Sequence, residues 1–286
     1  AAGIIINWDD FSELSEVIPL LTRVYPNGSA DVNHFHAAGG MGFLIHTLLE
    51  NGLLHNDVNT ILGFGLDKYT KEPKIKENKL VWKEGPKKSL NESIIRKVSN
   101  PFHLKSGLRI MSGNIGRAVM KISAVDAKQM IIKAEAIVFE EQDDLIKAFK
   151  NNELDKDFIA VLPFQGPKQN GMPELHQLTP TLTILQRRGF KVGIITDGRM
   201  SGASGKIPAA IHVVPEAKDG GLMSRIQTGD VILMNAITGE LQCMDPQVNN
   251  RDVRTKDNSN VFGLGRELFF NMRTQVSSSE EGASFL

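Results

Sequence analysis

Apolar residues recur at helical spacing in the first part of the chain. Four of them predict a helix over residues 11–24, with Asp9 and Asp10 as caps: Leu14, Val17, Ile18 and Leu21. A second helix is expected after Gly39-Gly40, ending near Gly52. Residues 67–100 are rich in Lys and Glu and interrupted by prolines, which is typical of a boundary or linker at the surface.

The pattern becomes strand-rich from residue 105. Short apolar runs predict strands at 108–111, 119–122, 136–139, 158–162 and 191–195. Two further runs, at 231–234 and 241–244, flank a Thr-Gly-Glu turn and predict a hairpin. Helices are expected over 143–149 with Asp143 as cap, over 175–185 with Pro180 as a kink or start, and over 265–276. This part of the chain is therefore predicted to be mixed α/β.

Composition narrows the class of protein. The 286 residues are 41% apolar, enough for one large domain or two modest ones. Basic and acidic residues number 33 each, so the charge balance indicates neither a nucleic-acid nor a membrane partner. No apolar run approaches the roughly 20 residues of a membrane span, and no signal peptide is visible. The single cysteine, Cys243, excludes an internal disulfide and indicates a reducing, cytoplasmic location.

The first residues are unusual for an intact protein. The chain lacks an initiator Met and enters the apolar run Ile4-Ile5-Ile6 almost at once. This favours a segment of a longer protein over a processed N-terminus.

Two glycine-rich loops are the candidates for chemistry. The first, residues 165–174, joins a strand to a helix, and Pro173 suits a first helical turn. Glu174 would then lie near the helix N-terminus, where stabilisation of the helix dipole is a sufficient explanation for it.

The second loop, residues 196–206, contains three glycines that let backbone N–H groups approach a ligand. It is not a phosphate-binding P-loop, because Met200 and Ile207 stand where that motif needs Gly and Ser or Thr. It is not a nucleophile elbow, because Arg199 and Ala203 replace the required glycines. The loop could present two hydroxyls and two cations to an anion: Ser201, Ser204, Arg199 and Lys206. A purely structural turn is equally compatible with this sequence.

The remaining metal-binding residue types give weak signals. The seven histidines form no zinc pattern. His34 and His36 precede Gly39-Gly40, where a helix entry could aim them at a ligand, but surface positions explain them as well. Cys243 is expected to be a buried, inert thiol.

The two loops carry a family resemblance. Residues 196–202, Thr-Asp-Gly-Arg-Met-Ser-Gly, with residues 212–217, His-Val-Val-Pro-Glu-Ala, resemble the motifs of the family that includes dihydroxy-acid and phosphogluconate dehydratases. Residues 166–174 resemble the family's other C-terminal motif. The resemblance covers essentially the whole chain, and several stretches are more similar to the phosphogluconate branch: residues 37–40, 113–114, 203–206 and 265–269.

The resemblance implies both a fold and an activity. Residues 1–95 would be a helical remnant of an α/β N-terminal domain with its linker, and residues 96–286 a swivelling β/α domain with a partly closed, barrel-like sheet. The implied enzyme is a hydro-lyase that converts 6-phospho-D-gluconate into 2-dehydro-3-deoxy-6-phosphogluconate in the Entner–Doudoroff pathway. Its partner would be a small phosphorylated sugar acid, and the full-length protein is expected to be a homodimer.

The resemblance also implies a three-part site. An iron–sulfur cluster would act on the leaving C3 hydroxyl, Mg²⁺ would hold the carboxylate and the C2 hydroxyl, and Ser201 would remove the C2 proton. Glu174 is carried over as a magnesium ligand, which suits a hard carboxylate oxygen. The expected substrate-binding residues are Arg199, Gly202, Ser204 and Lys206.

Some features depart from the family pattern. A cluster needs several thiolates, so its ligands are expected outside this chain, which would be inactive alone. Pro163 stands where relatives tend to have Arg, and Ala203 replaces a hydroxyl residue of some sugar-acid dehydratases, a role that Ser204 could take over. Two alternatives stay open: a dehydratase of another sugar acid or dihydroxy acid, and a non-catalytic swivelling interaction domain.

Overall fold

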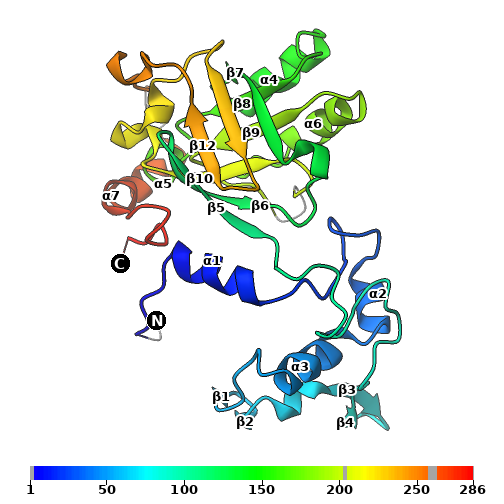
Figure 1. Cartoon of the computed structure of the whole chain (residues 1–286). Coiled ribbons are helices and arrows are strands. Elements are labelled where there is room, and N and C mark those ends of the chain that lie inside the picture. The colour runs from blue at the N-terminus through cyan, green and yellow to red at the C-terminus, as the bar shows by residue number, and fades with distance from the viewer. Residues whose placement is uncertain (1–2, 202–204, 257–262, 286) are drawn as a thin grey trace. The chain divides into compact units, whose positions relative to one another are not determined.

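The computed structural model describes residues 3–201, 205–256 and 263–285, which form two compact units (Figure 1). Unit 1 contains the first twelve residues and everything from Leu108 onward, whereas unit 2 is Glu13–Gly107. The units therefore part at a different place from residue 95, where the sequence placed the domain boundary, and that boundary stays a prediction.

The first helix begins earlier and ends sooner than the apolar spacing predicts. α1 spans Trp8–Val17. Its cap is Asn7, whose side-chain oxygen accepts a hydrogen bond from the Asp9 N–H at 2.8 Å. The expected end at residue 24 was wrong because Pro19 disfavours helical backbone at the residue before it.

Unit 2 combines helices with two small hairpins. Its remaining elements are α2 (Val32–Ala37), α3 (Gly40–Glu50), β1 (Asn59–Thr60), β2 (Gly63–Phe64), β3 (Lys71–Lys76) and β4 (Lys79–Glu84). α3 confirms the helix expected after Gly39-Gly40. The linker expected over residues 67–100 was wrong in two places: β3 and β4 pair as an antiparallel hairpin, and Ile94 and Ile95 are buried with Phe43.

Unit 1 is built around a closed barrel of eight strands in the order β10-β6-β5-β12-β11-β7-β8-β9. The strands are β5 (Leu108–Gly113), β6 (Gly116–Lys121), β7 (Ile131–Val138), β8 (Phe158–Leu162), β9 (Val192–Thr196), β10 (Ala209–Val214), β11 (Val231–Asn235) and β12 (Glu240–Cys243). β7 to β10 run parallel, and β11 and β12 form the predicted antiparallel hairpin. The mixed α/β class is confirmed, and the barrel is closed rather than partly closed.

Helices cover one side of the barrel. α4 (Gln142–Lys150) and α6 (Leu178–Arg187) lie outside β8 and β9 (Figure 1). β8 is consequently buried on both faces: Ile159 and Val161 face the barrel core, and Ala160 and Leu162 pack in the helix-covered layer. The cap of α4 is Glu141 rather than the predicted Asp143. Pro180 lies in the first turn of α6, where a missing N–H is tolerated.

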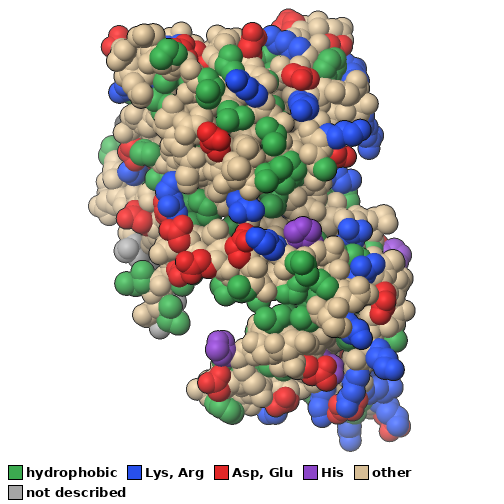
Figure 2. Space-filling view, in the orientation of Figure 1, with side chains coloured by type: hydrophobic (Ala, Val, Ile, Leu, Met, Phe, Trp, Pro, Cys, Tyr) green, Lys and Arg blue, Asp and Glu red, His purple; other side chains and the backbone are tan. Residues whose placement is uncertain are grey.

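Shorter elements complete the unit and connect the strands. They are α5 (Pro167–Asn170), α7 (Phe270–Gln275) and the 3₁₀ helices η2 (Ala127–Gln129), η4 (Ala217–Asp219), η5 (Leu222–Ser224), η6 (Val248–Asn250) and η8 (Arg266–Phe269), with η1 (Asp67–Thr70) in unit 2. Acidic and basic side chains are interspersed over the face of unit 1 shown in Figure 2. Within the described ranges, no helix combines the length and the apolar character of a membrane span.

Candidate active site

The second glycine-rich loop leaves the barrel at the end of β9 and is fixed there by Asp197. This side chain is fully buried, and its carboxylate accepts hydrogen bonds from three backbone N–H groups, those of Phe164 (3.2 Å), Gln165 (2.7 Å) and Ala217 (2.9 Å). Burial raises the pKa of Asp197, and the three N–H donors oppose that rise. One carboxylate therefore ties together the segments that follow β8, β9 and β10.

Gly198 lets the two glycine-rich loops approach each other. A Cβ at this position would lie 2.8 Å from the Gln165 Cβ and 3.2 Å from the Gln165 backbone oxygen. The glycine is thus needed for close packing of backbone against backbone.

The first glycine-rich loop does not lead directly into a helix. Gly171 and Met172 both have positive φ angles, and α6 begins only at Leu178. The expectation that Pro173 lies in a first helical turn was therefore wrong; the proline of a first turn is Pro167, at the start of α5. Glu174 instead forms an extended bridge with Arg199.

Glu174 and Ser201 are brought together across the two loops. One carboxylate oxygen of Glu174 accepts the Ser201 backbone N–H at 2.7 Å, and the other lies 3.3 Å from the Arg199 guanidinium. Arg199 also donates through Nε to the Met172 carbonyl at 2.8 Å. The carboxylate thus fixes the backbone of the residue predicted to be the base, and Arg199 is engaged within the loop pair.

Ser201 borders a small hollow on unit 1. Lys121 is the one charged side chain in its lining. The other lining residues are mostly apolar: Met200, Gly205, Ile207, Ala209 and Ile211. Burial lowers the pKa of Lys121. Sequence reasoning passed over Lys121, although a lysine at the end of a buried strand, here β6, was a signal available to it.

The remaining predicted substrate-binding residues do not gather at this hollow. Lys206 lines a different and larger cavity together with Lys128, Arg187 and Lys191. Gly202 and Ser204 lie outside the described residues, as does Ala203. Their assigned roles stay predictions.

Two groups near the loops were missed as individual residues. Glu216 is 5% exposed, and burial is the largest cause that raises its pKa to about 7. One of its oxygens accepts the Lys168 N–H at 3.2 Å, and the other has no hydrogen-bond partner in the described structure. His212 donates its backbone N–H to the Gly198 carbonyl at 2.9 Å, and burial lowers the pKa of its imidazole. The sequence contained a signal for each residue. Glu216 directly follows Pro215, and His212 interrupts an otherwise apolar run.

The described part of the chain does not hold a complete metal site. The described ranges contain no group of three or more His, Cys, Asp or Glu side chains arranged to hold a metal ion. Glu174 offers a hard carboxylate that magnesium favours, but any further ligands would have to come from elsewhere. Cys243 does not fit an iron–sulfur ligand, because it is 4% exposed and belongs to the barrel core.

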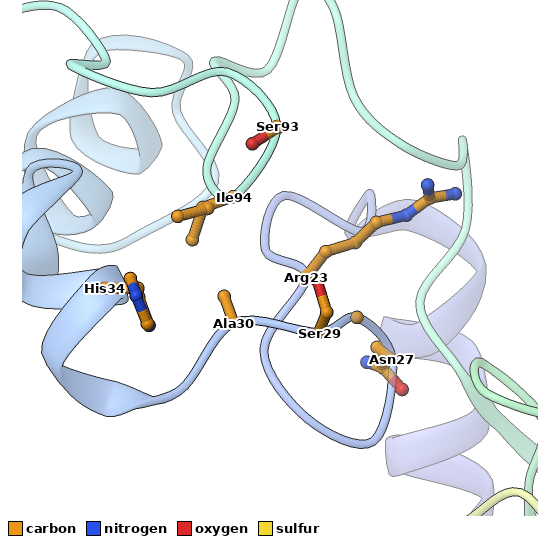
Figure 3. Close-up of a pocket in the computed structure, with 8 residues that line it drawn as sticks. Arg23, Asn27, Ser29, Ala30, His34, Ser93 and Ile94 are labelled. Carbon is orange, nitrogen blue, oxygen red and sulfur yellow. The ribbon is translucent and has the colours of Figure 1, made fainter.

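Unit 2 has a polar cavity of its own, with a volume of about 330 Å³. Figure 3 shows Ala30 and Ile94 between the side chains of His34 and Arg23. His34 pairs with Asp31 at 2.8 Å and completes the capping box of α2. This contact gives His34 a structural role, and His36 is an exposed residue of the same helix.

Unit 1 thus combines a closed barrel with two interlocked glycine-rich loops, in which the Glu174 carboxylate holds the Ser201 backbone. Two family models match the chain: dihydroxy-acid/6-phosphogluconate dehydratase C-terminal over residues 93–283, and the N-terminal counterpart over residues 1–69. The chain belongs to the dihydroxy-acid/6-phosphogluconate dehydratase family.

Curated relatives show the same family. Phosphogluconate dehydratases of Pseudomonas aeruginosa and Escherichia coli K12 are 53% and 51% identical to this chain over 99% of its length. A dihydroxy-acid dehydratase of Sulfurisphaera tokodaii is 34% identical over 86% of the chain. The chain spans about half the length of these relatives: 47%, 48% and 42%.

Proposed function

We propose that this chain is part of a hydro-lyase that dehydrates 6-phospho-D-gluconate to 2-dehydro-3-deoxy-6-phosphogluconate. The observation that carries the proposal is the contact between the Glu174 carboxylate and the Ser201 backbone, which brings the two loop motifs into one site. The higher identity to phosphogluconate dehydratases than to the dihydroxy-acid dehydratase supports the sugar-acid substrate.

In the proposed reaction, the Ser201 alkoxide takes the proton from C2. The C2–C3 double bond forms as the C3–oxygen bond breaks, and the leaving hydroxide takes a proton from solvent to become water, while Ser201 returns its proton to solvent. The resulting enol then becomes the 2-keto acid. A serine hydroxyl is a poor base unless nearby charge favours its ionised form. Two cations lie near the loop: Arg199 belongs to it, and Lys121 lines the same hollow as Ser201.

Glu174 would hold Mg²⁺ through its carboxylate while keeping the Ser201 backbone in place. Mg²⁺ and an iron–sulfur cluster, when bound, would supply positive charge and Lewis acidity at the substrate carboxylate and the leaving hydroxyl. The cluster ligands would come from outside this chain, since Cys243 does not fit that role. Arg199, Gly202, Ser204 and Lys206 are proposed to bind the substrate.

The full-length enzyme is proposed to be a cytoplasmic homodimer. The single, buried cysteine supports a reducing compartment. Exposed apolar side chains near the C-terminus, among them Leu264, Leu268 and Phe269, support a surface that is covered in the assembled protein.

A substrate panel tests the proposal. The full-length enzyme would be given 6-phosphogluconate, unphosphorylated gluconate and a branched dihydroxy acid, and release of the 2-keto acid would be followed. We expect the highest kcat/KM for 6-phosphogluconate. A preference for another acid would support the second dehydratase alternative, and no turnover of any acid by cluster-loaded protein would favour the interaction domain.

A further inference from the structure

A cavity of about 700 Å³ on unit 1 has a strongly basic lining. Its cations come from four separate segments: Lys128 from η2, Arg187 from the end of α6, Lys191 from the residue directly before β9 and Lys206 from the loop before β10. The only carboxylate in the lining is that of Asp126. With four cations and one carboxylate, the wall carries a net charge of +3.

Three of these cations are not explained by neighbouring acids. Among the described residues, Lys128, Arg187 and Lys191 make no ion pair, and Asp126 accepts a hydrogen bond from the Lys128 backbone N–H at 2.9 Å. The C-terminal end of α6 favours a cation beside it, but a helix end carries only about half an elementary charge. That charge accounts for Arg187 and leaves Lys128 and Lys191 without a structural reason.

The wall also contains amide groups with unused hydrogen-bonding capacity. Gln129 donates to the Phe190 carbonyl at 3.0 Å, while its Oε1 has no partner. Gln186 has no partner for its Nε2. Both atoms are buried, which is costly for an unpaired polar atom, and a rotation of either side chain toward the cavity would offer one donor or acceptor to a ligand hydroxyl.

We propose that this basic cavity, lined by Lys128, Arg187, Lys191 and Lys206, binds a phosphate monoester that also carries hydroxyl groups. Arg and Lys form charge-assisted hydrogen bonds to phosphate oxygens, and a dianionic phosphate matches the excess charge better than a single carboxylate does. The volume lies within the range of about 300–1,000 Å³ that is usual for small-molecule sites. The ligand is either the phosphate end of the substrate, a reading that rests on the proposed function, or a separate phosphorylated metabolite.

The test on the present chain needs no catalysis. Binding of inorganic phosphate, 6-phosphogluconate and gluconate would be measured by calorimetry at low ionic strength. The double variant Lys128→Met with Lys191→Met is compared with a control that removes two other exposed lysines of unit 1, Lys133→Met with Lys218→Met. We expect the cavity variant to weaken 6-phosphogluconate binding about tenfold or more and the control to leave it unchanged.

Three outcomes would overturn the site: no phosphate binding by the unaltered chain, equal affinity for gluconate and 6-phosphogluconate, or an equal loss in both double variants. The full-length enzyme separates the two sources of the ligand. A raised KM for 6-phosphogluconate with unchanged kcat in the cavity variant assigns the substrate's phosphate to the cavity. Unchanged kinetics with lost phosphate binding assigns a separate ligand, and this result stands even if the proposed reaction fails its own test.

Discussion

The carboxylate of Glu174 accepts the backbone N–H of Ser201 at 2.7 Å, although the two residues are 27 positions apart in the chain. A proposed metal ligand and a proposed base are thereby held in one rigid arrangement before any ligand binds. The same carboxylate also faces Arg199, so its charge is already partly balanced. This arrangement separates the positioning role of Glu174 from its role as a metal ligand.

Glu174 variants can distinguish the two roles. In the full-length enzyme, Glu174→Gln keeps an oxygen that can accept the Ser201 N–H but loses the negative charge that magnesium favours. We expect it to need more Mg²⁺ for activity while its melting temperature stays near that of the unaltered enzyme. Activity would be measured over a Mg²⁺ titration beside thermal unfolding.

Glu174→Ala is the matched comparison, because it removes the hydrogen bond as well as the charge. It should lose the Mg²⁺ response and also about 1–2 kcal/mol of stability, the usual cost of a backbone N–H left without its acceptor. An unchanged Mg²⁺ requirement with full activity in Glu174→Gln would refute the ligand assignment.

Ser201→Ala tests the base. The Ser201 side chain makes no hydrogen bond with other described residues, so its loss should change the free energy of unfolding by less than about 0.5 kcal/mol. Turnover by the full-length enzyme should fall by about 100- to 10,000-fold, the usual effect of losing a general base. Exchange of the substrate C2 proton with deuterated solvent should stop as well.

If Ser201 has only a structural role, the Ser201→Ala variant should show the opposite pattern of stability and turnover. Stability would then fall, and the remaining turnover would follow the folded fraction. A well-folded Ser201→Ala enzyme with near-normal turnover and C2 exchange would end the proposed mechanism.

Asp197→Asn tests the buried link between the loops. An amide can replace only part of the carboxylate's acceptor capacity, so at least one of the three N–H donors would be left unpaired. We expect a loss of about 2–4 kcal/mol in the urea unfolding of this chain. The control is Asp219→Asn, which breaks a surface pair with Lys168 and should cost at most about 1 kcal/mol. Equal losses in the two variants would show that Asp197 is not the anchor.

These contacts also show what the sequence could and could not reveal. The strand at 158–162 was predictable because five consecutive apolar residues lie between polar or breaking residues. The pairing of Asp197 with backbone groups 33 and 20 positions away was not, because such a bond depends on which strands are neighbours in the barrel. Local chemistry likewise could not place Lys206 in a cavity apart from Ser201, since the return path of the chain to β10 decides it.

The start of α1 is a different kind of failure. Asp9 and Asp10 are good caps by type, but Asn7 has the same ability and comes earlier. Asn7 was overlooked as a cap because it directly follows the apolar residues Ile5 and Ile6. The sequence also could not explain why residue 198 is a glycine. The reason is its close approach to Gln165 in the other loop, and only the fold brings the two loops together.

Glu216 gives the chain a testable dependence of stability on pH. Its pKa is raised from 4.5 to about 7 in the folded chain, chiefly by burial, with Asp197 and Asp219 adding repulsion. Below pH 4.5 the carboxyl is protonated in both the folded and the unfolded chain. Between that pH and about 7 only the unfolded chain releases the proton, so the free energy of unfolding falls as pH rises, by up to about 3 kcal/mol.

Glu216→Gln keeps the shape and the acceptor for the Lys168 N–H but cannot ionise. The variant should match the unaltered chain near pH 4.5 and become more stable than it as the pH approaches 8. Urea unfolding at several pH values would measure the difference between the two, in which the contribution of Asp197, also raised by burial, largely cancels. Two stability curves that stay parallel from pH 4.5 to 8 would mean that Glu216 titrates alike in the folded and unfolded chain, and that its burial has no energetic consequence.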